Sequence, residues 1–144
     1  MNEVVYGALA IPYRKRDEKY DFLLLKHKSG MWTFPGGGKD EEDETLEDCL
    51  IRELSEEIGI NVDKNDLKHT GLVNKFVYGP EKPARNGMKG ETHFWLLELA
   101  GDEKFGSWDN IIDHGWFSAE KIVELLPFDD ERKVFLKAIE RIDN

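Results

Sequence analysis

Residues 38–60 read GKDEEDETLEDCLIRELSEEIGI, and this stretch decides the fold because it specifies a loop, a helix and the end of that helix. Thr45 and Asp48 have the spacing of a capping box, and Gly59 supplies the left-handed residue that ends many helices. The stretch therefore predicts a helix over residues 45–58. On a helical wheel its apolar side chains fall on one arc, which we expect to be buried: Leu46, Leu50, Ile51, Leu54 and Ile58.

Three glutamates occupy one edge of this helix, beside the apolar arc. Glu53, Glu56 and Glu57 stand at i, i+3 and i+4, so their carboxylates share a face and repel one another. A hard divalent cation would supply the counter-charge, and Mg²⁺ prefers oxygen ligands of this kind. A glutamate-rich helix can also present a solvated face. The Pro-Gly-Gly-Gly loop at residues 35–38 favours a metal site, because glycines let the backbone approach a metal or a phosphate closely.

The spacing of this region resembles the signature of the Nudix hydrolases. It reads Gly, five residues, Glu, seven residues, then Arg-Glu-Leu-x-Glu-Glu-x-Gly-Ile, and its defining residues are Gly38, Glu44, Arg52, Glu53, Leu54, Glu56, Glu57, Gly59 and Ile60. Members of this family cleave a diphosphate inside a nucleoside diphosphate linked to another group. The resemblance implies an α/β/α sandwich with a mixed β-sheet and the box helix on one face. It also implies Mg²⁺ as the cofactor, with Mn²⁺ as the alternative ion.

The resemblance implies a metal shell, whose expected members are Gly38, Glu53, Glu56, Glu57 and Glu98. The Gly38 ligand would be a backbone carbonyl, with Gly37 as the alternative. Glu98 matches a strand position that supplies a ligand in members acting on nucleoside triphosphates, and the alternative is a plain surface carboxylate. Members acting on dinucleoside polyphosphates or RNA 5′ ends instead use a glutamate ahead of the last strand, where this chain has Asn110.

The expected catalytic residues are Glu53, Glu57 and Arg52. Either glutamate would take a proton from the attacking water, and the sequence does not decide between them. Arg52 would hold the loop and the helix in shape, by pairing with Glu56 at i+4 or by reaching back to Glu44.

Substrate-binding residues are expected in and beside the polar segment 79–90: Tyr78, Lys82, Arg85 and Lys89. By resemblance, Tyr78 stands where hydrolases of diadenosine polyphosphates carry a tyrosine that stacks on a nucleobase. The three cations would contact the outer phosphates, and a solvated loop tip is the alternative. Trp108, Trp116 and Phe128 are candidate walls of a base pocket, although packing against the last helix would also explain Trp116.

A dinucleoside polyphosphate such as diadenosine tetraphosphate is the expected substrate. Nucleoside triphosphates and triphosphorylated RNA 5′ ends are the alternatives, and a domain that senses a nucleotide without hydrolysing it is a further class. The formal charge of −10 argues against broad nucleic-acid binding, so an RNA 5′ end is the one nucleic-acid partner considered.

Composition bounds the class of protein. The 144 residues suit one domain, 1–144, as a monomer or a homodimer. No apolar stretch is long enough to span a membrane. Cys49 is the single cysteine, so an internal disulfide cannot form, and we expect a buried spectator thiol in a cytoplasmic protein.

Segments rich in β-branched and aromatic residues predict the sheet. Strands are expected over residues 4–13, 20–27, 67–78, 91–99 and 111–117, with a short extended piece at 31–35. Residues 61–66 are expected to form a loop, and helices are expected over residues 119–126 and 129–142. Because strands and helices do not alternate strictly, a mixed sheet packed between helices is the expected α/β architecture.

Overall fold

A seven-stranded mixed sheet forms the centre of the protein, in a computed structural model that describes residues 3–106 and 110–143. The strands are β1 (Val4–Arg16), β2 (Lys19–His27), β3 (Trp32–Thr33), β4 (Gly36–Gly38), β5 (Leu67–Val77), β6 (Lys89–Glu98) and β7 (Ile111–Phe117). Their order is β3-β2-β1-β6-β5, with β4 paired to β1 and β7 paired to β2. Strands β1 and β6 run parallel and the other pairs run antiparallel, which confirms the mixed sheet.

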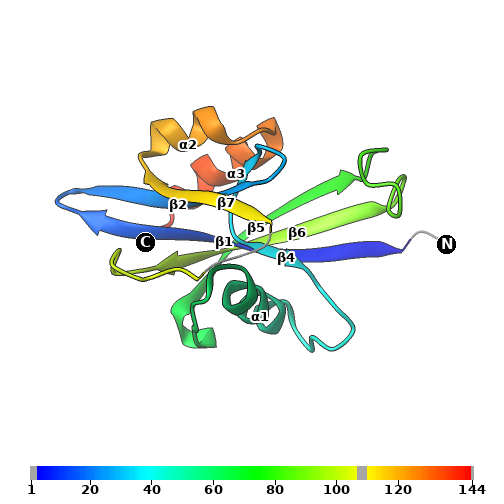
Figure 1. The fold of residues 1–144 in the computed structure, drawn as a ribbon, viewed down its shortest axis with the longest axis horizontal. Helices are drawn as coiled ribbons and strands as arrows, with labels where there is room; N and C mark the ends of the chain where they lie inside the picture. Colours follow the sequence, from blue (N-terminus) through cyan, green and yellow to red (C-terminus); the bar gives the residue numbers. More distant parts are fainter. Residues whose placement is uncertain (1–2, 107–109, 144) are drawn as a thin grey trace.

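Helices cover both faces of the sheet (Figure 1). Helix α1 (Leu46–Ile58) lies on one face, and α2 (Ala119–Leu125) and α3 (Asp129–Ile139) lie on the other. The predicted α/β/α sandwich is therefore confirmed. Within residues 3–106 and 110–143, no helix combines the length and the apolar character that a membrane crossing requires.

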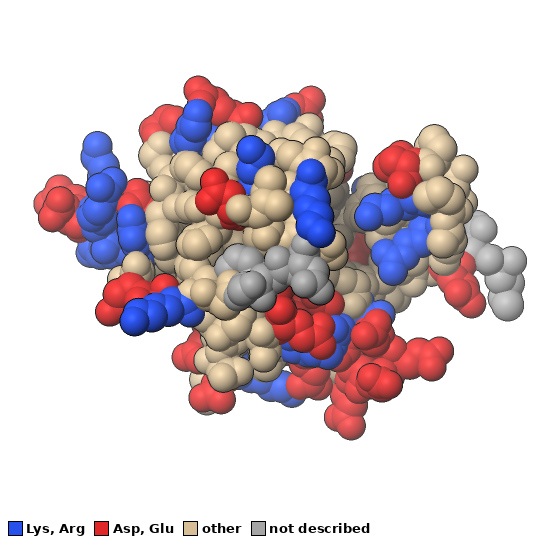
Figure 2. Space-filling view, in the orientation of Figure 1, with Lys and Arg blue, Asp and Glu red and all other residues tan. Residues whose placement is uncertain are grey.

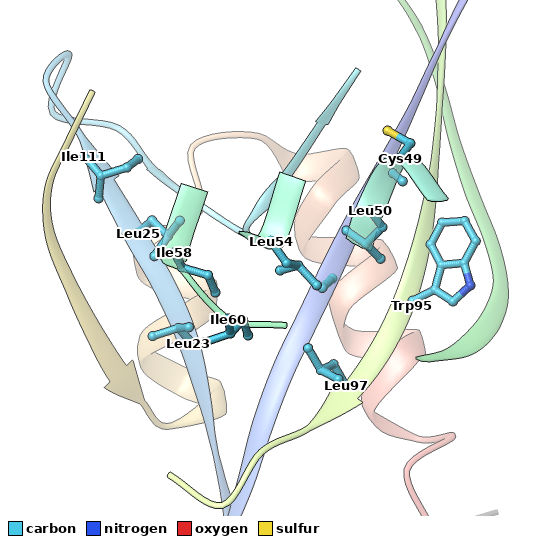
Figure 3. Close-up of a cluster of buried hydrophobic side chains, with 12 residues drawn as sticks. Leu23, Leu25, Cys49, Leu50, Leu54, Ile58, Ile60, Trp95, Leu97 and Ile111 are labelled. Atoms are coloured by element: carbon cyan, nitrogen blue, oxygen red, sulfur yellow. The ribbon is translucent and has the colours of Figure 1, made fainter. Parts of the chain in front are cut away.

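Each face of the sheet has its own hydrophobic cluster. On the α1 side, Leu50, Leu54 and Ile58 are fully buried against strand residues such as Leu25 and Trp95 (Figure 3). A second cluster joins the opposite face to α2 and α3. Full burial of one such side chain contributes about 1.5–3 kcal/mol, so α1 is firmly held on the sheet. The predicted buried arc of this helix is confirmed at Leu50, Leu54 and Ile58, whereas Leu46 and Ile51 are only half-buried.

Strand β1 changes its neighbour along its length, and this change creates room for the glycine segment. Residues 13–16 of β1 pair with β2, whereas Gly7, Ala8 and Leu9 pair with β4. The glycines at 36–38 were expected to form a loop and instead form a short strand. A Cβ on Gly36 would lie 2.1 Å from the Ala8 carbonyl oxygen, so only glycine lets this strand approach β1 so closely.

The other predicted elements are present, with shifted ends. Strand β1 runs three residues further than expected, and β6 begins at Lys89 inside the segment expected to be a loop. The last helix ends at Ile139, and residues 141–143 form a turn. The loop expected at 61–66 contains a single 3₁₀ turn, η1 (Lys64–Asp66).

Candidate active site

Helix α1 presents its glutamates to the glycine strand β4. The helix begins at Thr45, whose side chain accepts a hydrogen bond from the Asp48 amide at 3.1 Å, and ends at Gly59, whose φ is 71°. Both predicted ends are confirmed. With the apolar arc buried on the sheet, the adjoining edge of α1 lies against β4, so Glu53 and Glu57 meet the backbone of the glycines.

Glu57 is a half-buried carboxyl group attached to the glycine strand. Its Oε1 accepts a hydrogen bond from the Gly36 amide at 3.0 Å. Burial, opposed by the Gly36 hydrogen bond and assisted by the nearby Glu53 charge, raises the pKa of Glu57 to about 7. Among the ion pairs of the described residues, none involves Glu57. The described part of the protein therefore supplies no cationic partner to the Glu57 carboxylate.

Glu53 packs against a glycine that must lack a side chain. A Cβ on Gly37 would lie 2.6 Å from the Glu53 carboxyl carbon. Burial raises the pKa of Glu53, and the Arg52 guanidinium acts in the opposite direction. The missing side chain of Gly37 thus leaves the space that the Glu53 carboxylate occupies.

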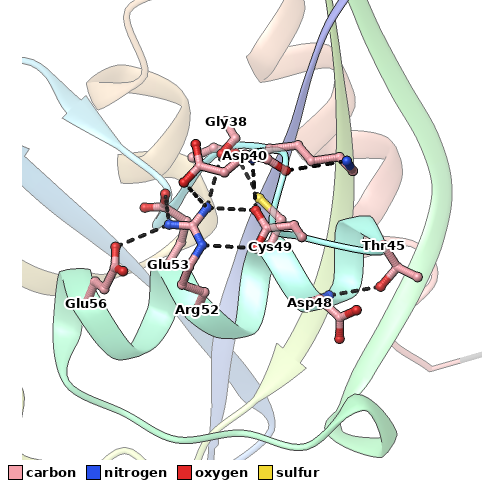
Figure 4. Close-up of polar contacts among 11 residues, drawn as sticks. Gly38, Asp40, Thr45, Asp48, Cys49, Arg52, Glu53 and Glu56 are labelled. Atoms are coloured by element: carbon pink, nitrogen blue, oxygen red, sulfur yellow. Dashed lines mark hydrogen bonds and ion pairs between the residues drawn. The ribbon is translucent and has the colours of Figure 1, made fainter.

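Arg52 joins the loop before α1 to the carboxylates of α1 (Figure 4). Its Nη1 donates to Glu53 at 3.0 Å and to Glu56 at 3.2 Å, and its Nη2 donates to the Gly38 carbonyl at 3.3 Å. The predicted i+4 pair with Glu56 is confirmed. These contacts fit the structural role that the sequence resemblance implied for Arg52.

Asp43, not Glu44, is the main partner of Arg52. Its two carboxylate oxygens accept from Nε at 3.1 Å and from Nη2 at 2.9 Å, and one of them also accepts from the Asp40 amide at 2.9 Å. The Arg52 hydrogen bond lowers the pKa of Asp43 to about 2. The alternative partner Glu44 makes no hydrogen bond or ion pair with Arg52 within residues 3–106 and 110–143, because the turn that begins at Asp40 directs Asp43 inward and leaves Glu44 exposed.

The three helix glutamates do not converge on one point. Glu53 and Glu56 are directed to Arg52, whereas Glu57 is directed to Gly36. Accordingly, the described residues contain no group of three or more side chains arranged as metal ligands. The guanidinium supplies the counter-charge that the sequence analysis assigned to a cation for Glu53 and Glu56.

The residues present nevertheless fit a hard divalent cation. The carboxylates that surround Arg52 outnumber its single charge: Asp40, Asp43, Glu53 and Glu56. Glu57 adds a buried carboxyl group that pairs with no cation in the described part of the chain. Carboxylate and carbonyl oxygens are the ligands that Mg²⁺ and Mn²⁺ accept, and the excess negative charge favours such an ion. Rotation of Glu53 and Glu56 away from Arg52 would be required.

Glu98 lies away from these carboxylates. It pairs with Tyr13 in the parallel β1–β6 register, whereas Gly37 pairs with Ala8, which pairs with His93. Five residues along a strand correspond to about 16 Å. Glu98 is exposed at the other end of β6, as its alternative interpretation expected. The sequence alone gives no strand register, and with the register observed here Glu98 is not part of the metal shell proposed below.

A small pocket of about 170 Å³ opens beside the glycine strand. Its lining includes Gly7, Gly38, Tyr78, Arg85 and Thr92. The Arg85 guanidinium lies 5.5 Å from the centre of the Tyr78 ring and donates to the Tyr78 hydroxyl at 3.4 Å. Two of the predicted substrate-binding residues therefore lie together, next to the predicted metal-binding loop. Sequence reasoning missed Thr92 and Gly7, because nothing marks them until β1 and β6 are paired.

The other predicted binding residues are dispersed. Figure 2 shows a hollow between the body of the domain and the projecting end of the β5–β6 hairpin, with basic side chains along it. Lys82 is close enough to lower the pKa of His27, although burial of His27 has the larger effect. Lys89 begins β6 and does not line the pocket.

Within the described residues, the expected aromatic base pocket is not formed. Trp116 packs on the α1 side of the sheet under the Arg14 guanidinium, 4.8 Å from the ring centre. Phe128 is half-exposed at the start of α3, on the opposite face. Trp108 lies outside the described residues. Cys49 is buried as expected, and burial raises the pKa of its thiol to about 12.

Comparison with known proteins gives one family and several related folds. The sequence profile of the NUDIX domain matches residues 5–139. An 8-oxo-dGTP diphosphatase from Proteus vulgaris is 53% identical over 47 residues, which are 33% of this chain and 41% of that protein. The match thus spans less than half of that relative.

Two solved structures illustrate the likeness of fold. An Ap4A hydrolase binary complex from C. elegans superposes with a TM-score of 0.78 and 22% identity, covering 96% of this chain and 98% of that one. The dihydroneopterin triphosphate pyrophosphohydrolase of E. coli superposes with a TM-score of 0.77 and 17% identity, covering 94% of this chain and 95% of that one. At these identities the likeness concerns the fold alone.

Proposed function

Because the chain belongs to the NUDIX family of hydrolases, we propose that it is a Mg²⁺-dependent pyrophosphohydrolase that cleaves a phosphoanhydride bond in a nucleoside diphosphate linked to a second group. Mn²⁺ is the alternative ion. The observation that carries this proposal is the meeting of acidic α1 with the glycine strand, where Glu57 bonds Gly36 and Glu53 occupies the space beside Gly37.

The metal would be held by Glu53, Glu56 and Glu57, with a carbonyl of the glycine segment. When bound, such an ion neutralises phosphate charge and lowers the pKa of water that it coordinates. The Gly38 carbonyl already faces the same guanidinium as Glu53, so these two donors lie close together. Arg52 would hold the loop before α1 against the helix. Whenever the glutamate carboxylates turn toward it, its guanidinium would neutralise part of their negative charge.

Glu57 is our first candidate for the general base. Its carboxyl group accepts from the Gly36 amide and is not engaged by the Arg52 guanidinium, which binds Glu53 and Glu56. Glu53 is the alternative, because it lies beside Gly37 in the same glycine segment. Phosphoryl transfer needs little covalent help from protein, so orientation of the water and neutralisation of charge would supply most of the rate.

A dinucleoside polyphosphate such as diadenosine tetraphosphate is the substrate we favour. Tyr78 offers an aromatic ring in the same pocket as Gly38, which fits a base held next to the phosphates. Arg85 beside Tyr78, and Lys82 near His27, would neutralise outer phosphates. The fold likeness to an Ap4A hydrolase agrees with this choice without deciding it.

A nucleoside triphosphate is the second candidate. The local identity to an 8-oxo-dGTP diphosphatase favours it. Against it, Glu98 was the residue that linked this chain to triphosphate-specific members, and it lies at the other end of β6.

A nucleotide panel tests the proposal directly. Protein stripped of metal would be incubated with Mg²⁺ or Mn²⁺ and with dinucleoside polyphosphates, nucleoside triphosphates, nucleotide sugars and triphosphorylated RNA, and the products would be identified by chromatography. We expect metal-dependent cleavage, fastest for a dinucleoside polyphosphate. No cleavage of any substrate with either metal would refute the proposal.

Substitution of Glu57 tests the assignment of the site. Glu57→Gln keeps an acceptor for the Gly36 amide, so the variant should fold, while turnover should fall about 10²–10⁴-fold. Glu42→Gln, a change at an exposed glutamate in the loop before α1, is the matched control and should leave the rate unchanged. Wild-type turnover in Glu57→Gln would contradict the assignment.

A further inference from the structure

Strand β5 contains a bulge where its pairing with β6 shifts. Between His69 and Val73 the register changes, and residues 70–72 stand opposite the single residue Phe94. Strand β5 therefore carries two extra residues at this point, and Gly71 adopts a φ of 77° to accommodate them. A bulge of this kind fixes where the rest of the strand lies along its neighbour.

The hydrophobic pattern of β5 cannot fix this register by itself. A slip of one residue exchanges the two faces of a strand, whereas a slip of two residues keeps every side chain on its own face. Loss of the two extra residues from the bulge would be such a slip, and it would move the end of β5 by about 7 Å along β6. Other contacts must therefore select the observed register.

Side chains next to the bulge make those contacts. The Gly71 amide donates to Nδ1 of His69 at 2.8 Å. The Thr70 hydroxyl accepts from the Leu72 amide at 3.1 Å and donates to the Phe94 carbonyl at 2.8 Å. Backbone groups that a regular ladder would pair are thus satisfied by His69 and Thr70, and only in this register.

The hydrogen bonds of His69 have a single possible direction. An amide can only donate, so Nδ1 of His69 carries no proton, and Nε2 of the neutral ring donates to Nδ1 of His93 at 3.2 Å. Nε2 of His93 then donates to the Glu91 carboxylate at 2.9 Å. Protonation of His69 at Nδ1 would place two N–H groups face to face and would break the contact with Gly71.

The end of β5 leads directly to the pocket. Tyr78 follows β5, and its amide donates to the Met88 carbonyl at 2.9 Å, so its position depends on the β5–β6 register. Tyr78 and Arg85 line the pocket beside Gly38. A shift of several ångströms here would remove both from the glycine strand, and displacements of about 1 Å already cost activity in well-ordered sites.

We propose that His69 is a positioning residue: its neutral ring fixes the register of β5, which places Tyr78 and Arg85 beside the glycine strand, and its protonation releases that register. The part that concerns substrate rests on the proposed function. The part that concerns the bulge does not.

The charges around His69 set the pH at which the release occurs. From the sheet, Glu91 and Lys75 lie next to the hydrogen-bonded His69 and His93. Glu47 acts on His69 from α1. From the segment after α3, the Arg141 guanidinium donates to the Thr70 carbonyl. Burial, and then His93, hold the pKa of His69 below its ordinary value, while Glu47 acts in the opposite direction. We therefore expect the bulge to be intact at neutral pH and to open only as the pH falls below the ordinary pKa of histidine.

Hydrogen exchange at the Gly71 amide tests the bulge without any substrate. Relative to the intrinsic exchange rate, we expect wild-type protection to fall by up to about tenfold between about pH 7.5 and about pH 5.5, the limit for uptake of one proton by one histidine. In His69→Asn the side-chain oxygen can accept from the amide two residues on without titrating, so protection should persist at both pH values. His69→Ala should be unprotected at both. Constant wild-type protection, or a protected His69→Ala, would overturn the proposal.

Kinetics test the link to substrate. In the wild type and in the control His114→Asn, KM should rise about tenfold below about pH 6 with a smaller change in kcat, whereas His69→Asn should show no such rise. An equal rise of KM in His69→Asn would refute the positioning role. If no nucleotide is cleaved at all, the proposed function fails while the exchange result still decides the bulge.

Discussion

The contact between Asp43 and Arg52 should contribute strongly to stability, and Asp43→Asn tests this. Asp43 is 6% exposed and accepts three hydrogen bonds, two from Arg52 and one from the Asp40 amide. The substitution removes a buried charge and turns an amide N–H₂ toward a guanidinium. Breaking a largely buried, hydrogen-bonded pair in this way should cost about 2–4 kcal/mol. For a domain of this size that corresponds to a fall in Tm of about 6–12 °C.

Two variants of neighbouring residues are matched controls. Asp40→Asn changes a carboxylate that is 62% exposed and 3.5 Å from the same guanidinium, so it should cost less than about 0.5 kcal/mol. Glu44→Gln should be neutral, because Glu44 is exposed. The assay is urea unfolding followed by circular dichroism at pH 7.

The pH dependence gives an independent check. The folded pKa of Asp43 is about 2, below its ordinary value, so its contribution is complete above that ordinary value and is lost as pH falls through 2. The stability difference between wild type and Asp43→Asn should therefore be constant near neutral pH and should narrow steadily in acid. A difference below about 1 kcal/mol at pH 7, or one that does not narrow, would refute the reasoning.

Three further outcomes are expected. Gly37→Ala should keep the fold but displace the Glu53 carboxylate, so calorimetric titration with Mn²⁺ should show weaker binding than wild type, and unchanged affinity would argue against Glu53 as a ligand. Gly36→Ala should instead unfold the protein or lower its Tm sharply, because its Cβ would overlap the Ala8 carbonyl. Cys49 should resist thiol reagents at pH 8 until urea unfolds the chain, since burial raises its pKa to about 12, and rapid labelling of the native protein would contradict this.

Much of the local structure could be predicted because it depends on neighbouring residues. The capped helix, its buried arc and the pair between Arg52 and Glu56 follow from i, i+3 and i+4 spacing, and all are present. The glycine segment was less predictable. Its strand conformation depends on β1, which pairs with β2 at one end and with the glycines near Ala8. No local sequence pattern predicts this change of partner.

The site could be predicted only in part, because it too depends on contacts between residues that are far apart in the sequence. Glu98 was expected in the metal shell, but its distance from the glycine strand follows from strand register, which depends on tertiary pairing. Asp43 was overlooked as a partner of Arg52, and Glu44 was considered instead. Asp43 stands three residues after Asp40, a spacing at which a side chain can accept a hydrogen bond from the backbone and close a turn. The bulge of β5 gave no sequence signal beyond Gly71.

Part of the pocket lining is backbone, at Gly7, Gly37 and Gly38, and Ala8 and Leu9 also belong to the lining. Backbone atoms are the same whatever residue a gene encodes, so mutation has little to alter there, and a Cβ on Gly7 would come within 3.3 Å of the Gly37 carbonyl oxygen. We therefore expect changes in preference among ligands to arise from the polar and aromatic side chains of the lining, at Tyr78, Arg85 and Thr92. Libraries that aim to retarget this scaffold should randomise those three positions and keep the glycines constant.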